Sequence, residues 1–167
     1  MWSSERRTAL CGLLALPAVA LLPSCGFQMR QPARLSFASI ALTGFAPRSA
    51  IADELRRELA RQVRVADAPA GAEVVLQALE DQRERSVVAS TAAAQVRELQ
   101  LRLRFHFRAT TPGGRELIPR AELMLARDLS YRETAALAKE HEEAELFREM
   151  QSDIVAQVLR RLAAVRV

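Results

Sequence analysis

The sequence is poor in the residues that bind metals, form disulfides and catalyse reactions. It contains two cysteines and two histidines, too few for the clustered ligands that a metal site or a disulfide framework needs. His106 and His141 are far apart and neither has an evident catalytic partner. No glycine-rich phosphate loop, nucleophile elbow or histidine-glutamate zinc motif occurs. The sequence therefore predicts a protein that is not an enzyme and needs no cofactor or metal.

There is also little excess charge of either sign. The formal net charge is +4 over 167 residues, of which 50% are hydrophobic and 26% charged. This balance is typical of a single globular domain rather than of a disordered chain. The excess is too small to indicate a nucleic-acid partner, although it allows a basic face for an acidic one.

Only one long apolar run is present, at residues 8–22. It is shorter than the roughly 20 residues that cross a bilayer as a helix. Arg6 and Arg7 precede it, and Leu22-Pro23-Ser24-Cys25 ends it, which is the order of an export signal. The ending resembles the lipobox at which lipoprotein signal peptidase cuts. Cys25 would then carry diacylglycerol on its thiol and a further acyl chain, such as palmitate, on its amine.

This interpretation divides the chain into a signal peptide (1–24), a lipidated tether (25–33) and a domain (34–167). Cleavage would remove Cys11 and leave 22 basic and 19 acidic residues, a net charge of +3. Gly26, in place of an aspartate after the lipidated cysteine, favours the periplasmic face of the outer membrane. The alternatives are an ordinary secretory signal followed by a free cysteine, and an uncleaved membrane anchor.

The rest of the chain predicts a strand, a helix, three strands and a helix. Strands are expected at residues 34–42, 73–80 (extending toward 88), 99–109 and 115–129, the third showing strict apolar–polar alternation. The first helix follows Ser49 as its N-cap, with Ile51, Leu55, Leu59 and Val63 on one stripe. The second follows Tyr131, with Leu146, Met150, Ile154, Val158 and Leu162 at spacing four. We expect an α+β two-layer sandwich, with two helices on one face of an about four-stranded, mainly antiparallel sheet.

The last two strands predict a hairpin. Odd-numbered residues are apolar in both, so an odd number of loop residues keeps both apolar sets on one face. A three-residue loop at 112–114 fits, because its glycines supply the left-handed conformation that such turns need. The expected pairs are Thr111–Arg115, Phe105–Ala121 and Leu103–Leu123, with Arg104 opposite Glu122 on the other face.

One strand carries a row of cationic side chains. Arg102, Arg104, His106 and Arg108 alternate with apolar residues, so they project from one face. They could form a solvated face that Glu98, Glu116 and Glu122 neutralise. They could equally bind an anionic group, for which phosphorylated lipid headgroups are natural ligands because guanidinium matches phosphate geometry.

Cys25-Gly26-Phe27-Gln28-Met29-Arg30 resembles the start of mature lipopolysaccharide-assembly lipoproteins of the LptE family. Residues 129–140 and 158–162 resemble that family's last strand, loop and C-terminal helix. The resemblance implies a non-catalytic outer-membrane lipoprotein that plugs an LptD-like β-barrel, assists its assembly and binds lipopolysaccharide.

The resemblance also suggests where lipopolysaccharide would bind. Lys139 matches a basic position that precedes the family's last helix. Residues 88–94 lack the arginine that some relatives carry, and Arg83 and Arg85 are candidates to take its place. Arg102, Arg104 and Arg108 complete the candidate residues.

A second hypothesis, of another class, is a lipid- or solute-binding accessory lipoprotein of an envelope transporter, without a barrel partner. A large apolar pocket with convergent polar groups would favour it.

Overall fold

The computed structural model describes residues 34–90, 96–130 and 136–167. The predicted signal peptide, Cys25, Gly26 and the tether at 25–33 lie outside the described residues, as do most of the loop at 88–94 and the segment at 131–135. Within the described part of the chain, no helix is long and apolar enough to cross a membrane.

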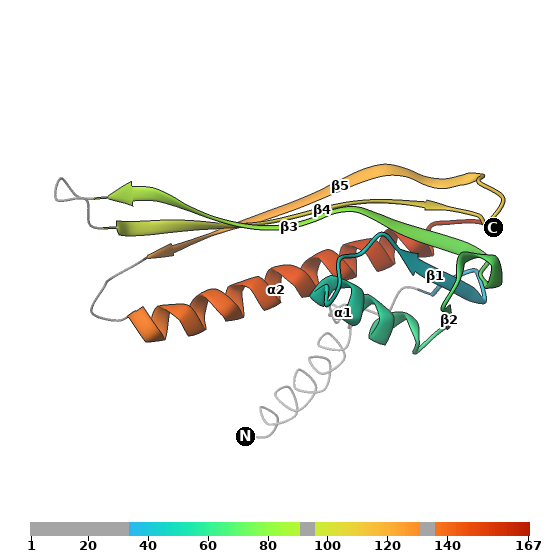
Figure 1. Ribbon diagram of the computed structural model, residues 1–167, viewed down its shortest axis with the longest axis horizontal. Coiled ribbons are helices and arrows are strands. Elements are labelled where there is room, and N and C mark those ends of the chain that lie inside the picture. Colours follow the sequence, from blue (N-terminus) through green and yellow to red (C-terminus); the bar gives the residue numbers. More distant parts are fainter. Residues whose placement is uncertain (1–33, 91–95, 131–135) are drawn as a thin grey trace, which may run out of the picture. The chain divides into compact units, whose positions relative to one another are not determined.

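The described chain forms one five-stranded sheet and two α-helices, of which α2 is much the longer (Figure 1). Its sheet order is β2-β1-β3-β4-β5. β1 runs parallel to β2 and β3, whereas β3, β4 and β5 are antiparallel to one another. The elements are β1 (Ser39–Thr43), α1 (Ala50–Leu59), β2 (Arg64–Ala66), a 3-10 turn (Pro69–Gly71), β3 (Val74–Ser90), β4 (Val96–Thr110), β5 (Glu116–Ser130) and α2 (Ala136–Ala163).

The predicted fold class is confirmed, with one more strand than expected. β2 pairs only Arg64, Val65 and Ala66 with β1, and three residues are too few to show an alternating pattern. The helix stripe was predicted to reach Val63, but α1 ends at Leu59. The residues that follow belong to a turn, in which Val63 N donates to Leu59 O over 2.9 Å.

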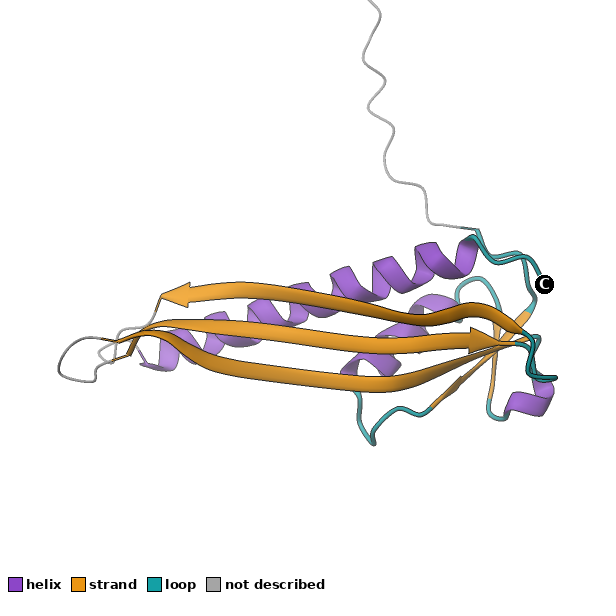
Figure 2. Cartoon of the chain, turned by 90° about the horizontal axis from the view of Figure 1, so that it is seen from above, coloured by secondary structure: helices purple, strands orange, loops and turns teal. Residues whose placement is uncertain are grey.

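Both helices pack on one face of the sheet (Figures 1 and 2). The odd-numbered residues of β4 from 99 to 109 are buried beneath them, as the alternation predicts. Phe105 stacks on Phe107 with ring centroids 5.6 Å apart, and Phe45 stacks on Phe105 at 5.9 Å. From α2, Ile154 and Val158 enter the same core.

The β4–β5 hairpin has the predicted turn but not the predicted register. Thr111 N donates to Arg115 O over 2.8 Å, and Gly114 adopts a φ of 87°. Beyond the turn, the pairing register between β4 and β5 shifts twice by one residue, so that Phe105 pairs with Leu123 rather than with Ala121. One of them falls at Pro119, which has no N–H to donate and is tolerated at a bulge. Because the two shifts add to two residues, the apolar faces still coincide.

A single bulge at Leu79 reverses the faces of β3. Ala78 pairs with Phe107, whereas Glu80 pairs with His106. Before the bulge, the even-numbered residues of β3 face the helices; beyond it, the odd-numbered residues do, since one extra residue exchanges the two sets. Gly44 approaches this bulge so closely that a Cβ there would overlap the carbonyl oxygen of Ala78.

Candidate functional site

The predicted cationic residues lie on two opposite faces of the sheet. Arg102, Arg104 and Arg108 project from β4 on the face that points away from the helices, which we call the open face. Arg83 and Arg85 follow the Leu79 bulge on β3 and pair with Leu103 and Leu101, so they face the helices. The structure therefore does not bring the six candidate residues together in one site.

The centre of the open face is neutralised by carboxylates from both neighbouring strands. His106 is only 8% exposed, and its Nδ1 lies 2.9 Å from Glu80 Oε2. Its Nε2 lies 3.3 Å from Glu122 Oε1, without the geometry of a hydrogen bond. Arg104 Nη1 lies 3.5 Å from Glu80 Oε1 and 4.0 Å from Glu84 Oε1.

This arrangement corrects two expectations from the sequence. Glu122 lies opposite His106, not Arg104, because of the register shifts in β5. The carboxylates that neutralise the row come chiefly from β3, whereas Glu98 and Glu116 form no ion pair among the described residues. Glu80 and Glu84 are acidic residues close to each other in the sequence. That they lie beside the cationic row could be recognised only once the Leu79 bulge was known.

The outer members of the cationic row make weaker contacts. Arg102 Nε donates to Gln100 Oε1 and Arg108 Nε donates to Gln77 Oε1, each over 2.8 Å. Both arginines remain exposed. The open face is therefore a mixed-charge polar surface in which Arg104 already has acidic partners.

On the helix side, Arg83 joins a polar network between the two layers. Its Nη2 donates to Gln151 Oε1 over 2.9 Å, and its guanidinium lies 5.4 Å from the ring centroid of Phe147. Gln151 Nε2 in turn donates to Glu54 Oε2 over 2.6 Å and to Ala50 O over 3.1 Å. This network links β3, α2 and α1, so the exposed Arg83 is already engaged by a side chain of α2.

Arg85 and Lys139 lie at one end of the sheet, which we call the tip. There β3 ends and β4 and α2 begin (Figure 1). Arg85 Nη1 lies 3.5 Å from Glu143 Oε2. Lys139 Nζ lies 2.6 Å from Glu142 Oε2 and 3.4 Å from Ser130 Oγ. Of the six candidate cations, these two share the start of α2.

The tip also exposes apolar side chains that sequence reasoning missed. Val87, Val88 and Leu137 are 55%, 48% and 77% exposed. A signal existed for Leu137 and for one of the two valines. Adjacent strand residues point to opposite faces, so Val87 and Val88 could not both be buried under α2. The α2 stripe, continued backward from Leu146 in steps of four, passes through Ala138 and leaves Leu137 outside it.

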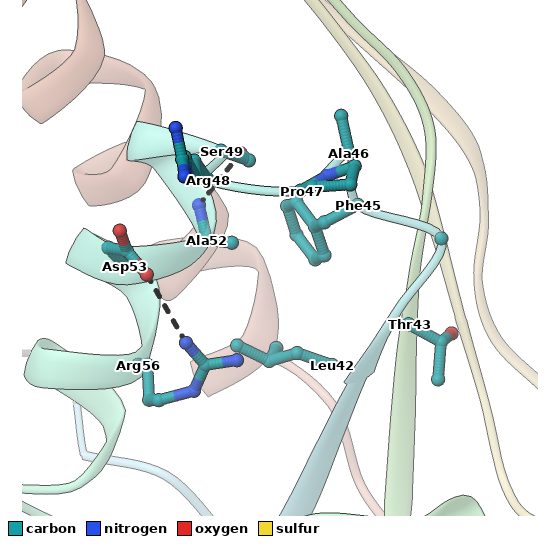
Figure 3. A pocket seen from close by; sticks show the side chains of 11 residues that line it. Leu42, Thr43, Phe45, Ala46, Pro47, Arg48, Ser49, Ala52, Asp53 and Arg56 are labelled. Atoms are coloured by element: carbon teal, nitrogen blue, oxygen red, sulfur yellow. Dashed lines mark hydrogen bonds and ion pairs between the residues drawn. The ribbon is translucent and has the colours of Figure 1, made fainter.

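A small pocket of about 290 Å³ lies between the β1–α1 loop and the start of α1 (Figure 3). Its wall includes Phe45, Pro47 and the ion pair in which Arg56 Nη1 lies 3.3 Å from Asp53 Oδ1. It is open and largely polar, unlike the large apolar cavity that the lipid-binding alternative requires. Among the described residues, no group of histidine, cysteine and acidic side chains is arranged to hold a metal ion.

Comparisons with known proteins agree with this fold. The LptE family model, described as lipopolysaccharide-assembly, matches residues 37–162. The solution structure of an uncharacterized lipoprotein B from Nitrosomonas europaea is 30% identical, with a TM-score of 0.71 over 83% of this chain and 91% of that one. A search of curated proteins gives no match.

Two further structures share the fold at lower identity. The rare lipoprotein B from Shewanella oneidensis is 24% identical, with a TM-score of 0.63 over 75% of this chain and 94% of that one. A minor lipoprotein from Acinetobacter baumannii is 22% identical, with a TM-score of 0.63 over 78% and 93%.

Proposed function

Since this chain belongs to the LptE family of lipopolysaccharide-assembly lipoproteins, we propose that it is anchored in the outer membrane through acylated Cys25, on the periplasmic side. There it acts as a non-catalytic subunit that plugs an LptD-like β-barrel, assists the barrel's assembly and binds lipopolysaccharide on its way to the outer leaflet.

The side chains at the tip are the main support for lipopolysaccharide binding. This glycolipid combines phosphates with acyl chains, so its binding site needs cations beside exposed apolar surface. The tip offers both, because Arg85 and Lys139 lie at the same end of the sheet as Val87, Val88 and Leu137. The acidic partners of Arg85 and Lys139 belong to α2, and both ion pairs are partly exposed. Exchanging such a carboxylate for a phosphate costs little, because an exposed ion pair contributes only about 0–1 kcal/mol.

The open face supports the role of a plug. Large outer-membrane barrels have polar interiors, and a partner inside one must present polar surface. The face combines arginines, glutamates, glutamines and His106 with paired charges. Such a surface can exchange its hydrogen bonds for those of a lumen wall without burying unpaired charge.

Two measurements test this function. The first is affinity purification from detergent-solubilised membranes, which should yield an outer-membrane barrel together with this chain. If the chain is always recovered free of any barrel, the plug role fails and the accessory-lipoprotein alternative gains support.

The second is direct binding of purified lipopolysaccharide. The double variant Arg85→Glu/Lys139→Glu should weaken binding at least tenfold, because it removes two cations that would face phosphate. The matched control Arg102→Glu/Arg108→Glu makes the same charge change on the open face and should bind almost normally. Equal losses in the two variants would show that binding responds to net charge and not to the tip.

A further inference from the structure

Arginines gather at the end of the domain opposite the tip, where the tether joins it. Ser36 Oγ donates to Val165 O over 2.6 Å, so the first described residues lie beside the end of α2. Figure 2 shows both chain segments at this end. Arg34, Arg160, Arg161 and Arg166 are exposed here, and we call these four residues the anchor-side surface.

Charge is separated along α2 and the residues that follow it. Residues 139–149 contain five glutamates against Lys139 and Arg148, whereas residues 154–167 contain three arginines and no acidic residue. Within the described part of the chain, none of the four arginines of the anchor-side surface forms an ion pair. Glu73 lies at this end, where it accepts the N–H of Ala38 over 2.9 Å, but it offsets only one charge.

Compensation of the helix dipole explains part of this pattern. Cations stabilise the last turn of a helix, which accounts for Arg160 and Arg161. Arg34 and Arg166 lie outside α2, and the dipole's influence falls off within the last turn. Their convergence on the same end therefore needs another reason.

Chain connectivity supplies that reason. Eight residues lie between Cys25 and Arg34, so the nine residue-to-residue steps of a fully extended tether reach about 30 Å. An anchored tether thus keeps this end, more than any other, close to the membrane surface. Because tethering raises the local concentration, weak attraction is enough to dock the domain. Arginines near an anionic lipid surface each strengthen binding roughly fivefold.

We propose that the anchor-side surface docks onto anionic phospholipid headgroups of the leaflet that holds the acyl chains of Cys25. Docking orients α2 so that the tip points away from that leaflet. This inference rests on the Cys25 anchor of the proposed function. It adds an orientation of the domain that the covalent anchor alone does not impose, because one attachment point does not fix the direction of α2.

The test uses the acylated mature protein in vesicles. Cys11 is removed with the signal and Cys25 is acylated, so an introduced cysteine is the single reactive thiol. Ala164→Cys places a fluorophore on the anchor-side end, and Leu137→Cys places one at the tip, about 40 Å away along the helix. The vesicles contain phosphatidylcholine alone or with phosphatidylglycerol, together with a headgroup quencher. We expect severalfold stronger quenching at position 164 than at position 137, only in the anionic vesicles, with loss of the difference at high salt.

Charge variants complete the test. Arg160→Glu/Arg161→Glu/Arg166→Glu should reduce quenching at position 164 to the level in neutral vesicles, and the milder triple Arg→Gln variant should do so partly. The control Arg48→Glu/Arg102→Glu/Arg148→Glu makes the same charge change elsewhere and should leave the quenching unchanged. Acylated protein whose quenching is the same in both lipids would overturn the docking inference alone. If mass spectrometry shows that Cys25 carries no acyl chains, the proposed anchor and the docking inference both fail.

Discussion

The guanidinium of Arg83 and the side-chain amide of Gln151 meet between the sheet and α2, with Nη2 and Oε1 2.9 Å apart. Gln151 is 6% exposed, and its other side-chain atom, Nε2, donates to Glu54 on α1. One amide therefore joins three elements that are distant in sequence. It fixes how α2 sits over the sheet more specifically than aliphatic packing does, because a hydrogen bond requires one geometry.

Gln151→Ala should destabilise the fold by about 1–2 kcal/mol, because it removes the hydrogen bonds to Arg83, Glu54 and the Ala50 carbonyl. The free energy of unfolding in urea measures this change. Gln157→Ala, a matched control on the same helix, removes a partly exposed side chain and should change it by less than about 0.5 kcal/mol. Equal effects of the two substitutions would show that the network contributes nothing beyond helix propensity.

Ser49→Ala should cost about 1–2 kcal/mol of stability. Ser49 Oγ accepts the N–H of Ala52 over 3.1 Å and donates to Asp81 Oδ2 over 2.6 Å. Alanine removes the N-cap of α1 and leaves the Asp81 carboxylate short of a donor. Ser49→Thr keeps both hydrogen bonds and should restore most of the thermal stability. If Ser49→Ala unfolds at the same temperature as the unsubstituted protein, the hydroxyl has no such role.

Substitutions at two glycines distinguish the free-energy cost of backbone strain from that of steric overlap. Gly44 and Gly114 both have positive φ, 75° and 87°. A Cβ at Gly44 would overlap the carbonyl of Ala78, whereas one at Gly114 would meet nothing. Gly114→Ala should therefore cost about 1–2 kcal/mol from the left-handed conformation alone. Gly44→Ala should cost about 2–5 kcal/mol, because overpacking adds to it. Urea denaturation of both variants checks the order, and a smaller loss at Gly44 would contradict the close approach.

Cys25→Ala should block processing, because the predicted signal peptidase acts only after a diacylglycerol is attached to this thiol. Uncleaved precursor should accumulate, which mass spectrometry of the membrane fraction detects. Cys11→Ala is the matched control, since Cys11 lies in the segment to be removed, and it should be processed normally. Normal processing of Cys25→Ala would rule out the lipobox interpretation.

The strongest sequence patterns predicted the elements well. Strict alternation in β4 identified its buried face, and the spacing of Leu146 to Leu162 identified the buried face of α2. Ser49 was correctly predicted as an N-cap because the capping interaction is local. The hairpin turn was also right, since Thr111, Gly114 and Arg115 are close in sequence.

The candidate site was predicted less completely. Lys139 and Arg85 lie at the same end, but Arg83 is engaged by Gln151, and the open face holds Arg102, Arg104 and Arg108 separately. The lateral partners of the cationic row were misassigned, because the register of each neighbouring strand was needed to identify them.

Local sequence therefore determined which segments form both helices and four of the five strands, and which residues of β4 and α2 are buried, because those patterns depend on side-chain period alone. Tertiary structure decided the rest through small irregularities in strand pairing. The Leu79 bulge decided which charges of β3 face α2 and which face His106, and the two register shifts between Glu116 and Ala121 decided that Glu122 meets His106. These irregularities belong to the pairing between strands, and a single residue inserted into one strand exchanges which side chains meet across the pair. The side-chain period of one strand alone does not reveal them.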